Sequence, residues 1–414
     1  MSNDNNDTPK PLKDFIIPLG QKIMELYWKP LFDYLKENPQ LIKTFPGFLL
    51  KKESLVFYFG KTHLAIEYYG PERIDDLNVD GGFELRFYDF TRSIENFIEQ
   101  IIGFTYDSSA GIEFPLAPYF EDLILPTNKG FDKLQELGWN FSAQEAIVGI
   151  NSGNFYIPKG EFVRMVNSRF YDADEKGLKT RHIKWIDFIP LKYDETSDIS
   201  DMLEIDFGVY TMNVVKHDAH YSYPLPDNND FRLFKLPKIN RFIEKIGNDE
   251  STEPQITSFL ALNENKFILL MAFLAKDIFP EVLCKWQSED RPDIKPDFFV
   301  LRANGYADIV EFKLPKLKSK SITGRENREA FSAEINSCIS QTRTYREYFN
   351  DPNNRKWFEK EYGFKVFKPR RILVLGRRWN FDNYEWKEII AEYNDVDIMN
   401  YDELIDGVTA QFYN

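Results

Sequence analysis

Asp297, Glu311 and Lys313 have the side-chain types and the spacing that phosphodiester hydrolysis requires. Cutting a phosphodiester needs an activated water and charge neutralisation at the phosphate. Mg²⁺ supplies both when two carboxylates hold it and leave positions open for water and phosphate oxygens. Lys313 lies two residues beyond Glu311, so in a β-strand both side chains point to one face, where an ammonium can orient the water or balance charge. The side chain of Phe312 points to the core, and its backbone carbonyl offers a further metal ligand.

A β-hairpin has to bring Asp297 to Glu311. Two strand-like segments flank the short loop 303–305, which ends in glycine. A three-residue loop with that glycine left-handed pairs Arg302 with Tyr306 and places Asp297 opposite Glu311, with β-carbons roughly 5 Å apart. A two-residue turn would instead send Glu311 to the other face. The proposed chemistry therefore predicts the three-residue loop.

A long helix is predicted over Arg325 to Tyr348, a segment without Pro or Gly. Gln341 and Tyr345 form an i, i+4 pair on one helical face, which Glu334 and Cys338 approximately share. We expect this face to lie over the carboxylates and to contact DNA phosphate. The alternative is an ordinary amphipathic helix with Tyr345 in the core.

The neighbouring segments complete an α-β-β-β-α-β order with an added βα. A helix is predicted over 258–278 and a short strand over 282–287, before the hairpin. A buried strand over 370–376 follows the long helix. The chain then ends in a strand over 396–401 and a helix that begins with DELID.

The preceding part of the chain reads as a mixed α+β region. Its start, 11–38, has apolar residues at helical spacing, interrupted by Pro18 and Pro30. A helix is predicted over 93–104, and strands over 54–60, 63–69, 81–90, 162–171, 182–193 and 202–215. A Pro-, Asn- and Asp-rich stretch over 218–257 suggests a boundary. We predict a tail and helical segment (1–50), an α+β sensing or regulatory region (51–240) and a catalytic domain (251–414).

The net charge of −14 is unevenly distributed. Between Lys295 and Arg378 there are 19 Lys and Arg against 10 Asp and Glu, a local excess of +9, whereas the remainder carries −23. A basic island in an acidic chain is typical of a phosphate-binding surface. The alternative is a solvated charged face.

Other features restrict the class of protein. The 414 residues contain two cysteines, too few for a disulfide framework or a structural zinc site. No secretory signal is visible, and the longest apolar run, 267–275, is too short for a bilayer, so we predict a cytoplasmic protein that does not insert in membranes. No phosphate-binding Gly-Lys-Ser/Thr loop or dinucleotide motif is found. His217 and His220 would suit a metal if helical, but the flanking Tyr221, Tyr223 and Pro224 suggest a loop.

The pattern PDFFVLRANGYADIVEFK, then Gln-x-x-x-Tyr, then RRILVLGRR, resembles the PD-(D/E)XK nuclease superfamily. More narrowly it resembles the nuclease domain of Shedu, a bacterial anti-phage defence family. The resemblance covers Thr257 to about Gly407. It implies a restriction-endonuclease-like αβββαβ core, Asp297 and Glu311 as metal ligands, Lys313 as catalytic lysine and Gln341 as a catalytic residue near the phosphate. It also implies Glu264 as a supplementary first-helix acid, and a homo-oligomer such as a dimer or tetramer.

We therefore expect a Mg²⁺-dependent deoxyribonuclease that accepts Mn²⁺ as a substitute and acts on double-stranded DNA in phage defence. Its N-terminal region is expected to control DNA recognition. The residues expected to contact DNA are Lys316, Lys318, Lys320, Arg325, Arg328, Tyr345, Arg377 and Arg378. One alternative is a restriction or repair nuclease on the same fold. Another is a DNA-binding protein that uses a nuclease fold only as a scaffold.

Overall fold

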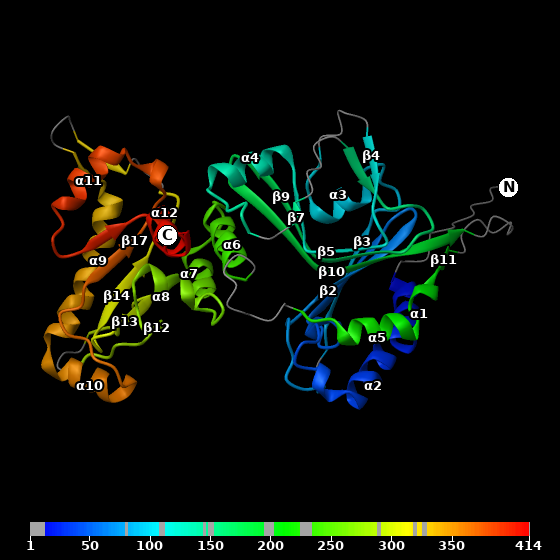
Figure 1. The fold of residues 1–414 in the computed structure, drawn as a ribbon, viewed down its shortest axis with the longest axis horizontal. Helices are drawn as coiled ribbons and strands as arrows, with labels where there is room; N and C mark the ends of the chain where they lie inside the picture. The colour runs from blue at the N-terminus through cyan, green and yellow to red at the C-terminus, as the bar shows by residue number, and fades with distance from the viewer. Residues whose placement is uncertain are drawn as a thin grey trace, which may run out of the picture. The chain divides into compact units, whose positions relative to one another are not determined.

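The computed structural model of the chain describes residues 13–78, 82–106, 112–143, 146–147, 153–193, 203–223, 234–287, 291–317, 321–324 and 329–413. The fold mixes helices and sheets and separates into two compact units (Figure 1). The first unit consists of Met1–Asp132, Glu145–Asp172 and Lys179–Asn228. The second consists of Lys133–Gln144, Ala173–Leu178 and Asn229–Asn414.

The first unit is built on a nine-stranded mixed sheet with the main order β3-β1-β2-β10-β9-β6-β7. Its strands are β1 (Ser54–Phe59), β2 (His63–Tyr69), β3 (Glu84–Asp89), β5 (Tyr119–Glu121), β6 (Leu123–Pro126), β7 (Ala146–Ile147), β9 (Val163–Asp174), β10 (Gly177–Tyr193) and β11 (Leu203–Ile205), with β4 (Ile112–Pro115) and β8 (Gly153–Tyr156) paired separately. Its helices are α1 (Lys13–Ile23), a π-helical turn (Met24–Trp28), α2 (Lys29–Glu37), α3 (Phe97–Ile102), α4 (Asn128–Glu136) and α5 (Met212–His220).

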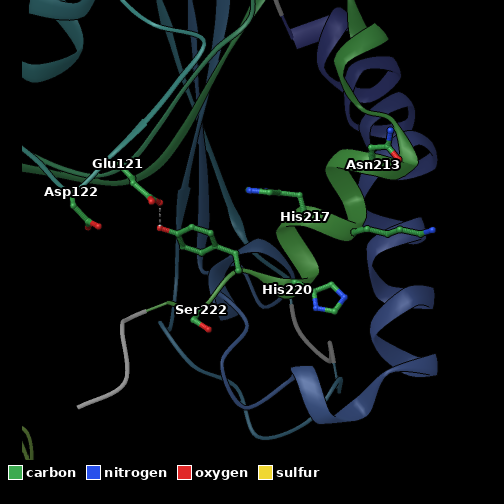
Figure 2. Close-up of a pocket in the computed structure, with 8 residues that line it drawn as sticks. Glu121, Asp122, Asn213, His217, His220 and Ser222 are labelled. Carbon is green, nitrogen blue, oxygen red and sulfur yellow. Dashed lines mark hydrogen bonds between the residues drawn. The ribbon is translucent and has the colours of Figure 1, made fainter. Parts of the chain in front are cut away.

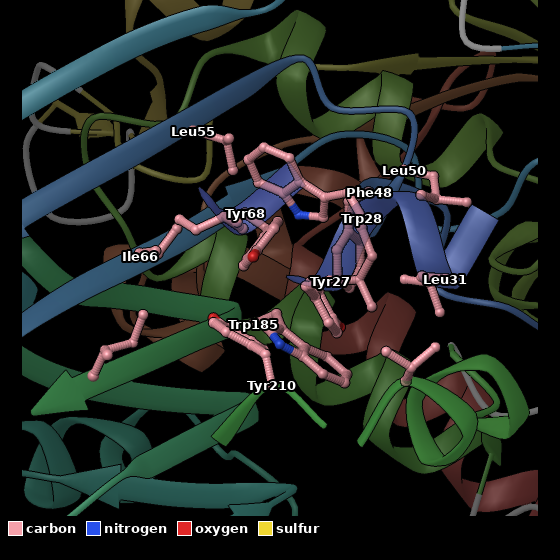
Figure 3. Close-up of a cluster of buried hydrophobic side chains, with 14 of the residues drawn as sticks. Tyr27, Trp28, Leu31, Phe48, Leu50, Leu55, Ile66, Tyr68, Trp185 and Tyr210 are labelled. Carbon is pink, nitrogen blue, oxygen red and sulfur yellow. The ribbon is translucent and has the colours of Figure 1, made fainter. Parts of the chain in front are cut away.

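Helices cover both faces of this sheet, as alternation along β1 shows. Leu55 and Phe57 belong to the core beneath α1, α2 and α5, whereas Val56 and Tyr58 belong to the core beneath α3. Figure 3 shows the first of these cores, in which aromatic rings from the π-helical turn lie among those of the strands. A strand buried on both faces explains why β1 is apolar throughout rather than alternating.

The same core encloses a group of charged side chains. Arg164 donates to Asp187 at 2.6 and 2.8 Å and to Asp218 at 2.8 and 2.9 Å. The hydroxyls of Tyr27 and Tyr210 donate to the same two carboxylates. All five side chains are buried, so these hydrogen bonds replace the water that the charges have lost.

The second unit contains a five-stranded sheet with the order β12-β13-β14-β17-β18. Its strands are β12 (Asp277–Pro280), β13 (Phe298–Leu301), β14 (Ala307–Phe312), β17 (Arg371–Val374) and β18 (Asp397–Met399), beside a short hairpin of β15 (Ile322–Thr323) and β16 (Ala330–Phe331). Its helices are α6 (Leu236–Ile246), α7 (Glu253–Ala261), α8 (Lys266–Ala272), α9 (Ala333–Asn350), α10 (Pro352–Tyr362), α11 (Asn383–Ala391) and α12 (Tyr401–Tyr413). Strands β14, β17 and β18 are parallel, whereas β12 and β13 are antiparallel to their neighbours.

Both faces of this sheet are also covered (Figure 1). On one face Phe299 and Ile309 pack with residues of α9 and α10. On the other face Phe312 contacts Tyr401 of α12, which in turn contacts Phe242 of α6. A polar residue on the α9 face of β14 is therefore buried between sheet and helix.

Two short segments from earlier in the chain belong to the second unit and dock around α6. Trp139 donates its indole N–H to Glu244 at 3.0 Å, and Asn140 exchanges hydrogen bonds with Asn240. The turn before β10 and the start of β10 pair with the residues that follow α6: the N–H of Asp249 donates to the Lys176 carbonyl, and the N–H of Leu178 donates to the Gly247 carbonyl. These contacts fix the end of α6, from which the chain continues into α7.

Several predicted elements are confirmed. The helical start appears as α1, the π-helical turn and α2; the helix over 93–104 as α3; and five of the six predicted strands of this region as β1, β2, β3, β9 and β10. The hairpin, the buried strand over 370–376 and the final βα appear as β13–β14, β17, and β18 with α12. The helix predicted from residue 325 is confirmed only as α9, which begins at residue 333 after β16.

Three predictions were wrong in detail. The segment 202–215 forms only the short β11 before a 3-10 turn and α5, because Thr211 caps a new helix there. The helix over 258–278 is two helices, since Asn265 in the turn between them bonds backbone rather than continuing the helix. The strand that pairs with β13 is β12 rather than 282–287. Pro280, at the end of β12, is tolerated because β12 is an edge strand.

Candidate functional site

The hairpin has the predicted register. Gly305 is left-handed (φ 83°), and the N–H of Arg302 donates to Tyr306 at 2.9 Å. The pairing of Phe298 with Val310, continued by one residue, places Asp297 opposite Glu311. The three-residue loop is therefore confirmed, and with it the placement of both carboxylates on the α9 face.

Glu311 is the centre of the cluster. Its carboxylate is 3% exposed and accepts hydrogen bonds from three side chains. Lys313 Nζ and Gln341 Nε2 donate to Oε1 at 3.0 and 2.9 Å, and the Tyr345 hydroxyl donates to Oε2 at 3.0 Å. Burial and Glu311 together raise the pKa of Tyr345, which keeps the phenol protonated as a donor. The ring of Tyr345 thus packs in the core, while its hydroxyl binds Glu311 of the candidate site.

Lys313 lies between two acidic groups. Its ammonium is 3.0 Å from Glu311 and 3.4 Å from Glu253, the first residue of α7. Burial alone would favour the neutral amine, but Glu311 and Glu253 outweigh burial and raise the pKa of Lys313. The Tyr401 hydroxyl holds the strand by donating to the Lys313 carbonyl at 2.6 Å. Lys313 is therefore a positioned cation at neutral pH.

Asp297 begins the hairpin and lies half-buried beside these groups. Burial first, and then the Glu311 carboxylate, raise the pKa of Asp297 to about 7, although the N–H of Phe312 donates to its Oδ2 at 2.7 Å. Residues in a strand point their N–H and C=O to the same edge, so the carbonyl of Phe312 also faces Asp297. The buried carboxylate of Glu311, the half-buried carboxylate of Asp297 and the Phe312 carbonyl thus converge where negative charge is in excess.

This donor set fits a hard divalent cation. Of the described residues, no three His, Cys, Asp or Glu side chains form a group able to hold a metal, so the protein offers two carboxylates and one carbonyl. Mg²⁺ commonly takes few protein ligands and keeps several waters, whereas structural zinc needs four ligands. Within the described part of the chain no donor reaches Asp297 Oδ1, and Glu311 keeps acceptor capacity at Oε2. A cation would offset the repulsion between the two carboxylates.

The predicted first-helix acid, Glu264, is exposed in the turn between α7 and α8. Among the described residues it makes no hydrogen bond or ion pair with the cluster, while Glu253 does. The sequence signal for Glu253 was its place at the first helical position, beside the capping Thr252. The helix predicted over 258–278 left Glu253 outside the helix, so Glu253 was not among the expected site residues.

The residues expected to bind DNA have different environments. Lys316 is exposed and pairs with Asp249, and Arg378 is half-exposed and pairs with Asp406. Arg377 is buried and donates to Asp402 at 2.7 Å, so its guanidinium also has a structural partner. Lys318, Lys320, Arg325 and Arg328 lie outside the described residues. For all the residues of this paragraph, DNA binding stays a prediction.

His217 and His220 lie in helix α5, so the loop predicted for them was wrong. They help to line a pocket of about 530 Å³ in the first unit, but their side chains point in different directions (Figure 2). His217 bonds Asp218 at 3.0 Å and His220 bonds Tyr34 at 3.1 Å. Each imidazole thus has its own partner.

Residues 250–405 match the family model described as Shedu protein SduA, C-terminal. This range contains the hairpin, Gln341, Tyr345 and Glu253, and the match confirms the resemblance to the Shedu anti-phage protein. The comparison with curated proteins found no match. None of the helices in the described part of the chain has the length and apolar character needed to cross a membrane.

Proposed function

We propose that the chain is a metal-dependent DNA endonuclease of the PD-(D/E)XK type that acts in the cytoplasm in anti-phage defence. The observation that carries the proposal is the convergence of Asp297, Glu311 and Lys313 on one face of a hairpin, beneath Gln341 and Tyr345. A protein that only bound DNA would not need two carboxylates that repel each other at such a place.

Each residue has a role that its contacts suggest. Asp297, Glu311 and the Phe312 carbonyl would hold Mg²⁺, or Mn²⁺ in its place, and the cation when bound supplies an activated water and charge neutralisation at the phosphate. Lys313, held protonated by Glu311 and Glu253, places positive charge where the phosphate gains negative charge in the transition state. Gln341 and Tyr345 keep the Glu311 carboxylate in one orientation.

The first unit is proposed to control which DNA is cut. The region outside 295–378 carries the acidic excess, which would repel non-cognate duplex unless specific contacts overcome the repulsion. Assembly into a homo-oligomer would give the chain two or more such sites. The alternative, a restriction or repair nuclease, would use the same residues with a different DNA signal.

The first test is plasmid cleavage by the full chain. Cleavage is expected with Mg²⁺ or Mn²⁺ and not in EDTA. Lys313→Ala should lower the rate by about a hundredfold or more while leaving DNA affinity nearly unchanged, because the ammonium acts mainly in the transition state. Lys365→Ala, an exposed lysine paired with Glu359, is the control and should cut normally. Undiminished cutting in chelator, or by Lys313→Ala, would refute the assignment.

A further inference from the structure

A pocket of about 310 Å³ lies beyond the carboxyl ends of the parallel strands β14 and β17. Its walls come from 315–317 after β14, from 377–380 after β17, from the end of α6 and from the two short segments that dock there. All of its lining residues belong to the second unit. Open α/β sheets bind ligands in the crevice outside the carboxyl ends of their strands. We call this cavity the Trp379 pocket.

The Trp379 pocket adjoins the candidate nuclease site. Two ion pairs connect residues 313–316, which follow β14, with residues 249–253, which lead into α7. Lys313 pairs with Glu253 at the site, and Lys316 pairs with Asp249 at the pocket. Three residues of extended chain span at most about 10 Å. The backbones of Lys313 and Lys316 are therefore at most about 10 Å apart, which places the Trp379 pocket next to the candidate site.

Arg377 lines this pocket, and one nitrogen of its guanidinium has no hydrogen-bond partner among the described residues. Its side chain is 2% exposed, and Nε and Nη2 donate to Asp402, with Nη2 also bonding the Leu137 carbonyl. Among the described residues no acceptor reaches Nη1, which is buried. A buried guanidinium N–H without an acceptor is destabilising. An oxygen of an anionic ligand would supply the missing acceptor.

Trp379 supplies an aromatic surface beside that donor. It is 51% exposed although the Arg377 guanidinium lies 4.2 Å from its ring centre. An exposed indole next to cations is a stacking platform for nucleobases. Lys316 and Lys133 also line the pocket, as do the acidic residues Asp174, Glu175 and Asp249. Cations suit a phosphate, and carboxylates accept hydrogen bonds from sugar hydroxyls and base amino groups.

Glycine keeps the pocket open at the docked turn. Gly177 has a left-handed backbone (φ 97°), and a Cβ there would collide with the carbonyl of Gly247. The close approach of these two backbones forms one wall. A larger residue at Gly177 would separate the docked turn from the end of α6.

We propose that the Trp379 pocket binds one nucleoside phosphate, with the base stacked on Trp379 and a phosphate oxygen bound by Lys316 beside the Arg377 guanidinium. The nucleotide has two possible sources: an unstacked nucleotide of the DNA strand held at the adjacent site, or a free mononucleotide. The first source rests on the proposed nuclease function, whereas the second does not.

The primary test is calorimetric titration of the full chain in EDTA, with deoxyadenosine monophosphate and inorganic phosphate as probes. The nucleotide should bind about tenfold or more tightly than phosphate, and Trp379→Ala should remove that advantage, because base stacking supplies it. The control Tyr384→Ala removes an exposed aromatic ring that does not line the pocket and should bind as the unaltered chain does. Equal affinity for the two probes, or an undiminished advantage in Trp379→Ala, overturns the proposal.

A second pair of variants tests the proposal independently, in case Trp379→Ala does not fold. Lys316→Ala removes an exposed pocket cation and Lys365→Ala an equally exposed lysine elsewhere. Only Lys316→Ala should weaken nucleotide binding, by about threefold to tenfold as expected for one phosphate contact near the surface. Equal binding by both variants contradicts the proposed phosphate position.

The source is decided by competition on the Lys313→Ala chain with a labelled duplex that has a single-stranded end. Displacement of DNA by deoxyadenosine monophosphate, lost in a chain that also carries Trp379→Ala, supports a nucleotide of the DNA strand. Nucleotide binding that leaves the DNA bound supports a free mononucleotide. Because binding in EDTA needs no cleavage, an inactive chain that still binds the nucleotide would refute only the nuclease function.

Discussion

Each unit places charged side chains between a sheet and its helices, but the two groups differ in charge balance and in access to solvent. In the first unit Arg164 is shared by Asp187 and Asp218, and both carboxylates accept additional hydroxyl donors. The neighbouring imidazole of His217 adds a second cation when protonated. Each carboxylate therefore has a cationic partner and enough donors, and the group is closed to solvent.

In the second unit three carboxylates surround one ammonium. Lys313 contacts Glu311 and Glu253, while Asp297 has a backbone N–H but no cation in direct contact among the described residues. Burial first, and then the Glu311 carboxylate, raise the pKa of Asp297. A closed, balanced group suits a structural role, whereas an open group with excess negative charge suits a bound cation and substrate.

The largest effect is expected from removing Arg164, the cation of the balanced group in the first unit. Arg164→Ala should lower the free energy of unfolding by about 3–5 kcal/mol, because it leaves two buried carboxylates without a partner. Chemical denaturation in EDTA measures this, with Arg86→Ala as control, since the fully exposed pair of Arg86 with Glu84 should contribute little to stability. Similar losses in the two variants would show that the buried group is not structural.

Neutralising the unbalanced group should have the opposite effect on stability. Because the pKa of Asp297 is raised to about 7, the folded chain holds a proton that the unfolded chain has released, so stability falls as pH rises from about 4 to 7. Asp297→Asn removes this loss and keeps an acceptor for Phe312. In EDTA at pH 8 the variant should be about 1–3 kcal/mol more stable, after allowance for partial exposure, and at pH 4 nearly equal. It should also be inactive.

Equal or lower stability of Asp297→Asn at pH 8 would contradict the view that the site lacks a balancing cation. Denaturation curves at both pH values, recorded without metal, provide the measurement. Adding Mg²⁺ to the unaltered chain should restore stability, by an amount that grows with the logarithm of the Mg²⁺ concentration once this exceeds the Kd. The same addition should have little effect on Asp297→Asn.

A smaller effect distinguishes the two candidate acids of the first helix. Glu253→Gln should reduce cleavage by about threefold to tenfold, because the half-exposed carboxylate acts through Lys313. It should also lower the pH at which Lys313 loses its proton, since Glu253 raises the pKa of Lys313. Glu264→Gln should change neither the rate nor the pH profile of cleavage. The reverse result would favour Glu264 as the acid.

The smallest effect concerns His217, whose pKa is raised by its hydrogen bond to Asp218 against the opposing effect of burial. A raised pKa means that stabilisation is present below about pH 6.5 and is lost as pH rises through the folded-state value. His217→Ala should lower the free energy of unfolding at pH 5.5 by under about 1 kcal/mol and leave it unchanged at pH 9. His220→Ala is the matched control. A loss that is independent of pH would contradict the ion pair.

Some of the candidate site follows from local sequence. Alternation in β13 and β14, with one left-handed glycine in the loop, leaves a single register that puts Asp297 and Glu311 on one face. The spacing of Gln341 and Tyr345 then places both on one face of α9, and the structure directs both to Glu311. These features depend on residues close in the chain, so spacing along the sequence predicts which of these side chains share a face.

The hydrogen-bond partners of other residues could not be predicted from spacing along the chain. Arg377 was expected to contact DNA from its residue type, and spacing did not indicate that Asp402 and the Leu137 carbonyl also bind its guanidinium. His217 and His220 were assigned to a loop because their aromatic and Pro neighbours obscured the helix that Thr211 caps. A residue type specifies which contacts are possible, while the fold decides which partner is present.

The sequence by itself determined the mixed α and β elements, the hairpin and the three residues that could act on a phosphodiester, because period, turn chemistry and spacing are local properties. Only the tertiary structure decided that Glu253, 60 residues before Lys313, pairs with it, and that Lys133–Gln144 and Ala173–Leu178 join the second unit. It also decided that Trp379 and a half-satisfied Arg377 face one pocket. These contacts join segments far apart in the chain, and they form because packing the helices on the sheet offsets the entropy lost in bringing those segments together.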